Sequence, residues 1–205
     1  METDEPMSTK IKDRFRGFLP VVIDIETGGT NPQTDAVLEL AASIIGMDDN
    51  GALFAHEAIS FHVNPFEGAN IDREALEFTG IIPDHPFRFA ISEAETLKKL
   101  FEQVDDAIKL TGCQRAVLVG HNAWFDLHFL QQMVKRVKIT NPFHKFTSFD
   151  TATLSALAFG QTVLARACKK AGISFDKNEA HSAAYDTEKT AELFCYIMNN
   201  MKLSI

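Results

Sequence analysis

The feature that most constrains this chain is a short apolar stretch that ends in two acidic residues. Val21–Ile25 follows a proline, is rich in β-branched residues and predicts a strand buried on both faces. Side chains alternate along a strand, so Asp24 and Glu26 point to the same side. Neighbouring carboxylates repel each other, and a divalent cation such as Mg²⁺ or Mn²⁺ would neutralise them. The same residues also fit a strand that ends in a solvated acidic turn, because two glycines follow.

Two further acidic residues stand at the predicted starts of helices. Asp126 comes soon after the apolar run Ala116–Val119, where its carboxylate can turn back toward the edge of a sheet. Asp186 shares i, i+4, i+7, i+11 spacing with core positions of the last helix, so it faces the core. His181 lies five residues before it. Taken alone, Asp186 also fits a helix cap and His181 a surface loop residue.

In chain order these residues form the pattern D-x-E…N-x-x-F-D…H-x₄-D. This pattern resembles the DEDD exonuclease superfamily in its His-containing branch, which includes polymerase proofreading subunits, oligoribonuclease-like enzymes and ribonuclease T. The resemblance runs from about Asp13 to Lys202. Four stretches resemble the ribonuclease T family more specifically: Asp13–Phe18, Phe61–Phe66, Asn141–His144 and Gly160–Leu164.

The resemblance implies hydrolysis with two divalent metal ions, about 4 Å apart. Asp24 would bridge two Mg²⁺, with Mn²⁺ as an alternative, and Glu26, Asp126 and Asp186 would complete their ligand shells. His181 would be the general base, since an unperturbed histidine pKa near 6.5 suits neutral pH. Hydrolysis from a 3′ end would release nucleoside 5′-monophosphates.

Base recognition is the second implication of the resemblance. Phenylalanines would sandwich the terminal bases and a glutamate would contact a base edge; these residues are Phe78, Phe125, Phe146 and Glu74. The chain contains 17 phenylalanines, so each of the three also fits a core position. The sequence departs from the family pattern at Thr30, where phenylalanine is more frequent. It also has Trp124 where a small polar residue is usual.

A formal charge of −8 contrasts with nucleic-acid binding, which depends largely on neutralising phosphates. The predicted metal site accounts for part of this acidity. Basic residues cluster at Arg14 and Arg16, and again at Lys109 and Arg115, although such residues also occur at ordinary solvated helix ends. The resemblance implies a homodimer in which the basic patch of each subunit serves the active site of the other.

The expected fold is α/β: a ribonuclease H-like, mixed five-stranded sheet flanked by helices. The strand order comes from the resemblance. Strands are expected at Val21–Ile25, Val37–Ile45, Ile59–Val63, Ala116–Val119 and Thr147–Phe149. Helices are expected after a capping box at Ser92–Glu95, and at Trp124–Val137, Thr151–Phe159, Thr162–Ala171 and Ala183–Met201.

The domain organisation is expected to be simple. Residues 1–12 are predicted as a disordered tail and residues 13–205 as one exonuclease domain, since 45% hydrophobic content suffices for a core. No apolar run of 18 residues occurs, so no membrane association is expected. Three cysteines at wide spacing suggest reduced thiols in a cytoplasmic protein.

We therefore expect a 3′–5′ exoribonuclease that acts on single-stranded 3′ ends of tRNA, small stable RNA and ribosomal RNA, with single-stranded DNA as a further substrate. Its roles would be tRNA end turnover and 3′ maturation. Three alternatives remain. They are a DNA-directed 3′–5′ exonuclease of the proofreading type, a non-catalytic nucleic-acid-binding module with the same fold, and a small-molecule phosphohydrolase that uses the same metals.

Overall fold

A long first strand organises the central sheet of the computed structural model, which describes residues 10–201. Strand β1 (Phe18–Thr27) pairs antiparallel with β2 (Val37–Met47) and parallel with β5 (Arg115–Gly120). Strand β6 (Phe143–Asp150) pairs parallel with β5, which gives the order β3-β2-β1-β5-β6. The inner strands read as continuous apolar runs because helices cover both of their faces.

Two short strands share the outer edge of β2. Strand β4 (Ile59–His62) pairs with Glu39–Ala42, and β3 (Leu53–Ala55) pairs with Ile45–Met47. Both fit because β2 is 11 residues long. The expected mixed α/β sheet is confirmed, but it has six strands instead of five. The added strand, β3, has three residues, which is too short to show an alternating pattern in the sequence.

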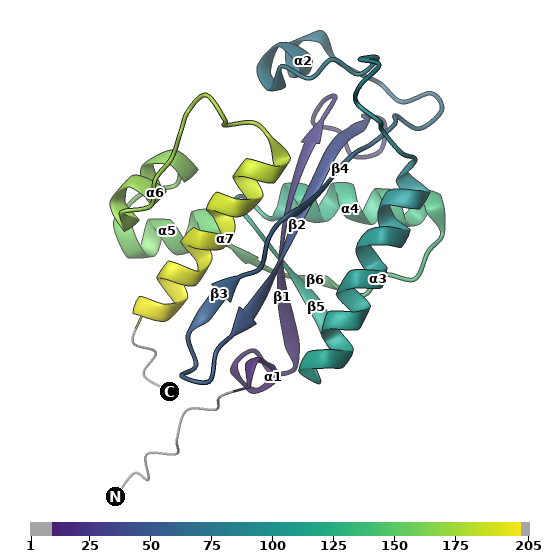
Figure 1. Cartoon of the computed structure of the whole chain (residues 1–205). Helices are drawn as coiled ribbons and strands as arrows, with labels where there is room; N and C mark the ends of the chain where they lie inside the picture. Colours follow the sequence, from purple (N-terminus) through teal and green to yellow (C-terminus); the bar gives the residue numbers. More distant parts are fainter. Residues whose placement is uncertain (1–9, 202–205) are drawn as a thin grey trace, which may run out of the picture.

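Helices cover the two faces of the sheet, as Figure 1 shows. Helices α3 (Glu93–Thr111) and α4 (Trp124–Val137) pack on one face. Helix α7 (Ala183–Asn200) crosses the other face against β1 and β2, flanked by α5 (Thr151–Phe159) and α6 (Leu164–Ala171). The α4 and α5 bounds agree with the sequence prediction. No helix within the described range could span a lipid bilayer.

Two short helices mark opposite ends of β1 (Figure 1). Helix α1 (Ile11–Arg14) precedes the start of the strand, and α2 (Arg73–Thr79) lies beyond its end. Ile11 is 5% exposed and belongs to the core. Ile11 lies within the span predicted as a tail, residues 1–12, of which residues 1–9 lie outside the described range.

Candidate active site

The end of β1 carries the first two acidic side chains. Asp24 and Glu26 share one face of the strand, as the two-residue alternation requires. In the antiparallel ladder with β2, Asp24 lies opposite Ala41 and Glu26 lies opposite Glu39. The pairing shifts register immediately after Glu26. Three carboxylates therefore gather where the ladder becomes irregular.

The third predicted acid, Asp126, is delivered by the first turn of α4. Its Oδ1 accepts a hydrogen bond from the backbone N–H of Ile25 at 3.0 Å, between the two acids of β1. This close approach depends on Gly120 at the end of β5, because a Cβ there would lie 3.1 Å from Asp126 Oδ2. Asp126 is 4% exposed. The carboxylate is thus fixed against the sheet edge, as the sequence predicts.

Helix α7 supplies Asp186, and the turn just before the helix supplies His181. Asp186 Oδ2 accepts a hydrogen bond from the backbone N–H of His181 at 3.0 Å. The other oxygen, Oδ1, is buried and has no hydrogen-bond partner among the described residues. One potential ligand atom each from Glu26, His181 and Asp186 lies within 4.8 Å of the other two. The structure thus brings the five predicted catalytic residues to one end of the sheet.

The electrostatics of this cluster favour the binding of cations. Burial raises the pKa of Asp24 well above its ordinary range, and neighbouring carboxylates raise it further. Burial raises the pKa of Glu26 to about 7, and the charges of Asp186 and Glu39 contribute. The pKa values of Asp126 and Asp186 are raised first by burial as well. Clustered oxygen donors and the unpartnered Asp186 Oδ1 suit hard divalent cations such as Mg²⁺ or Mn²⁺.

Glu39 is a fifth carboxylate that the sequence analysis missed. Its Oε2 accepts from the backbone N–H of Ala183 at 3.4 Å, at the start of α7. Its Oε1 lies 3.1 Å from His62 Nδ1 on β4. Glu39 thus links β2 and β4 to the helix that carries Asp186. The available signal was an acidic residue interrupting the apolar run of β2.

Glu39→Ala is expected to lower activity by roughly 10–100-fold, the usual cost of losing a residue that orients a metal ligand, because Glu39 contacts the start of the helix that carries the candidate ligand Asp186. Glu39→Gln should retain most activity, because its amide oxygen can still accept the Ala183 N–H. Single-turnover rates across a Mg²⁺ titration would measure both effects. Equal losses in the two variants would show that the charge of Glu39 matters and its hydrogen bond does not.

A cavity of about 930 Å³ opens beside the carboxylates. Its lining includes Glu26, Thr30, Glu74, Phe78 and Phe125. The ring of Phe78 lies 4.1 Å from that of His181, measured between centroids. Phe146 is absent from the described lining residues and stands 79% exposed on β6. The structure therefore joins two of the three predicted base-stacking phenylalanines, together with Glu74, in one cavity.

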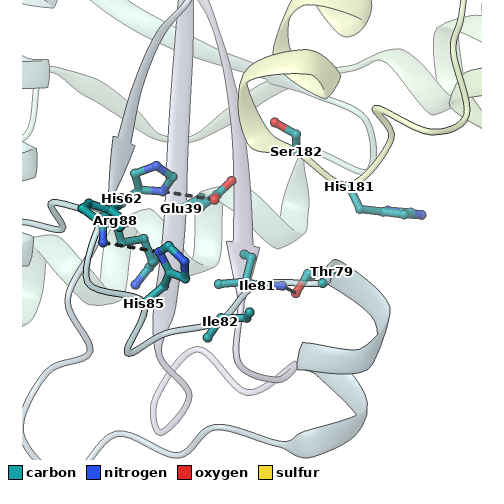
Figure 2. A pocket seen from close by; sticks show the side chains of 11 residues that line it. Glu39, His62, Thr79, Ile81, Ile82, His85, Arg88, His181 and Ser182 are labelled. Carbon is teal, nitrogen blue, oxygen red and sulfur yellow. Dashed lines mark hydrogen bonds and ion pairs between the residues drawn. The ribbon is translucent and has the colours of Figure 1, made fainter.

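A second cavity of about 410 Å³ is lined in part by His181 and Ser182 (Figure 2). The paired Glu39 and His62 form part of its wall, and Ile81 and Ile82 approach from the segment after α2. The buried side chain of Arg88 anchors this segment, since its guanidinium donates to three backbone carbonyls, those of Leu38, Val63 and Pro83. Arg88 therefore holds the segment against the end of the β2–β4 ladder.

The four predicted basic residues lie at the opposite end of the sheet. Arg115 pairs with Phe18 where β5 and β1 begin, six residues before Asp24. That span corresponds to roughly 20 Å of strand. Arg16, Lys109 and Arg115 are exposed. Arg14 is different, because its guanidinium donates to the carbonyls of Gly51 and Met198, both at 2.6 Å.

Arg14→Ala is expected to destabilise the fold by on the order of 2 kcal/mol, since it removes two charge-assisted hydrogen bonds. One of these satisfies a carbonyl in the last turn of α7. The melting temperature should fall by roughly 4–8 °C. Arg16→Ala is the matched control, and thermal unfolding should leave it within about 1 °C of the parent. Equal shifts would contradict the structural assignment of Arg14.

Comparison with known proteins assigns the chain to a family. A sequence profile described as an exonuclease matches residues 21–194. Ribonuclease T of Hahella chejuensis is 55% identical over 202 residues, which span 98% of this chain and 93% of that protein. The chain belongs to the ribonuclease T family of exonucleases. Membership in this family makes the protein a nuclease, in agreement with the sequence resemblance.

Solved structures show the same fold. E. coli exonuclease I in complex with a dT13 oligonucleotide matches with a TM-score of 0.66 at 19% identity, over 88% of this chain and 41% of that chain. The zinc-bound form of the exonuclease I–ssDNA complex matches with a TM-score of 0.67 at 20% identity, over 88% and 40% of the two chains. This chain therefore spans about two fifths of exonuclease I, and the likeness concerns the fold alone. The expected ribonuclease H-like architecture is confirmed.

Proposed function

We propose that this protein is a metal-dependent 3′–5′ exoribonuclease with a histidine general base. The observation that carries the proposal is the convergence of Asp24, Glu26, Asp126 and Asp186 with His181 at one edge of the sheet. The 55% identity to a ribonuclease T supports RNA as the substrate. The cellular substrates would be the 3′ ends of tRNA, small stable RNA and ribosomal RNA, in tRNA end turnover and 3′ maturation.

The mechanism follows from the roles of the side chains. Asp24, Glu26, Asp126 and Asp186 would hold two Mg²⁺ ions, or Mn²⁺. When bound, such ions activate the attacking water and stabilise charge on the phosphate and the leaving oxygen. His181 would accept the proton of that water. Attack on phosphorus breaks the bond to the upstream 3′ oxygen, which leaves as a hydroxyl and releases a nucleoside 5′-monophosphate.

The cavity beside the carboxylates suits the 3′-terminal nucleotides. Phe78 and Phe125 would stack on unpaired bases, a contact worth about 1–3 kcal/mol for each base. Glu74 would accept from a base edge. Phe146 would contact a base further along the strand. Base-paired ends cannot use these stacking positions, so the enzyme should slow as it approaches a stem.

The basic patch is proposed to act across a homodimer. Arg115 lies where β5 and β1 begin, Arg16 precedes β1 and Lys109 lies in the last turn of α3, so all three are at the far end of the sheet from Asp24 in the same subunit. A two-fold partner could present such a patch to the other active site, where it would bind phosphates of the substrate strand. Arg14 would support this surface by anchoring α1. Asp24→Asn subunits would be mixed with Arg16→Ala/Arg115→Ala subunits, and exchange of subunits would be confirmed. Activity should return, because each heterodimer pairs one intact active site with the intact patch of its partner. A mixture that stays inactive would contradict action in trans.

A direct test is digestion of a tRNA-like duplex with a short 3′ overhang, with Mg²⁺ and with EDTA. The expected result is Mg²⁺-dependent release of nucleoside 5′-monophosphates, faster from an RNA overhang than from the matched DNA overhang. A faster reaction on DNA would favour the proofreading type. Binding without hydrolysis would indicate a non-catalytic module.

Cytoplasmic localisation is proposed as well, since the three cysteines within residues 10–201 are buried and unpaired.

A further inference from the structure

The single tryptophan of this chain stands in an unusual position. Trp124 is the first residue of α4 and is 60% exposed, although tryptophan side chains are on average highly buried. Its ring meets Phe125 edge-on, with centroids 5.9 Å apart and planes at 88°. Phe125 itself lines the cavity beside the carboxylates. An exposed indole therefore borders the proposed site for the 3′-terminal bases.

The exposed face of α4 continues from Trp124 toward β6. His128 follows at i+4, is exposed, and its ring centroid lies 6.1 Å from that of Trp124. Gln131 follows at i+7 and donates a side-chain hydrogen bond to the carbonyl of Lys145. Residues at this spacing lie on one side of a helix. Two aromatic side chains and an amide thus form a row that ends at β6.

This row ends beside the one predicted base-stacking residue that the cavity leaves out. Lys145 and Phe146 are exposed on β6, and the Phe146 ring lies 4.6 Å from His144 between centroids. The seven steps from Trp124 to Gln131 rise about 10 Å along the helix. This length matches roughly three stacked nucleotides at about 3.4 Å each.

We propose that Trp124 and His128 form a stacking surface for single-stranded nucleic acid upstream of the 3′-terminal nucleotides. The strand would leave the cavity at Phe125, cross the exposed face of α4 and reach Phe146, where Lys145 can pair with a phosphate. Every base offers a face for stacking, so this surface binds without regard to sequence. The inference rests on the proposed function, because it takes the cavity as the site of the 3′ end.

The lone tryptophan reports directly on this surface. Intrinsic fluorescence would be titrated in Mg²⁺ with oligoadenylates of two and six nucleotides, with phosphorothioate linkages to slow hydrolysis. Binding would be measured in parallel by calorimetry. The hexamer should quench Trp124 emission strongly, and the dimer, which fills only the cavity, should change it little. A hexamer that binds without quenching, or a dimer that quenches as strongly, would overturn the proposal.

Variants separate stacking from folding. Trp124→Leu should weaken hexamer binding about tenfold and leave dimer binding unchanged, whereas Trp124→Phe should keep most of the affinity. Phe89→Leu is a matched control, since Phe89 is 82% exposed on the segment after α2 and lines neither cavity. Equal weakening for both oligomers would place the effect in the cavity and overturn the proposal. Failure of the parent protein to bind either oligomer would instead contradict the proposed function itself.

Discussion

Asp24→Asn is expected to abolish hydrolysis, with a loss of at least about a thousandfold. Metal ions in such sites stabilise transition-state charge by several kcal/mol, and each 1.4 kcal/mol corresponds to a factor of about ten. Asp24 lies between the acids of β1, α4 and α7, since the charges of Glu26, Asp126 and Asp186 all raise its pKa. Steady-state release of mononucleotides in Mg²⁺ measures the loss.

The same variant should be more stable than the parent when metal is removed. In EDTA at pH 8 the asparagine takes one charge out of a mutually repulsive cluster, so the melting temperature should rise by roughly 5 °C. Asp49→Asn, in the exposed turn before β3, is the control and should change neither activity nor stability. A lower melting temperature for Asp24→Asn would refute the repulsion argument.

Without metal, stability is expected to fall as the pH rises from about 4.5 to about 7. The folded state raises the pKa of Glu26 from 4.5 to about 7, so it binds the proton more tightly than the unfolded chain does. The protonated form therefore stabilises the fold, and this contribution is fully present below pH 4.5 and lost by about pH 7. Glu26 alone accounts for about 3 kcal/mol. The raised pKa values of Asp24, Asp126 and Asp186 act in the same direction.

Urea unfolding in EDTA at pH 5 and pH 7.5 tests this sign, and saturating Mg²⁺ should remove most of the difference. His121 contributes in the opposite sense, because burial lowers its pKa and its neutral form favours the fold at higher pH. Comparison with Glu26→Gln therefore isolates the Glu26 part. The raised pKa of Glu26 would be disproved if the parent protein were equally stable at both pH values and Glu26→Gln showed the same pH response.

Much of the fold can be predicted because the long elements carry their own end signals. The Oγ of Ser92 accepts from the N–H of Glu95 to begin α3, and Gly112 ends it at φ +69°. Other elements lack such signals. Helix α2 buries no side chain and β3 has three residues, so neither leaves a periodic hydrophobic pattern.

Some features of the candidate site can likewise be predicted from the sequence, and others cannot. The positions of Asp24, Asp126 and Asp186 are predictable because each stands at a strand end or helix start that the local sequence defines. The contact between Glu39 and Ala183 joins residues 144 positions apart, and that between Arg14 and Met198 joins residues 184 apart. Periodicity carries no information about such pairs, since it reports only on neighbours within one element.

The hydrogen bonds of Asp150 divide the active site into a stiff side and a compliant side. Its Oδ1 accepts the N–H groups of Asn122 and Ala123 ahead of α4, and its Oδ2 accepts that of Thr153 in α5. The turn that presents Asp126 is therefore braced twice. Around the start of α7 the contacts are weaker: the 3.4 Å contact from Glu39, the bond between His181 and Asp186, and the Tyr185 hydroxyl, which accepts the N–H of the exposed Asp176. A movement of His181 should then be confined to the segment just before α7, with β1 and α4 as the fixed reference, because the rest of α7 is packed against the sheet.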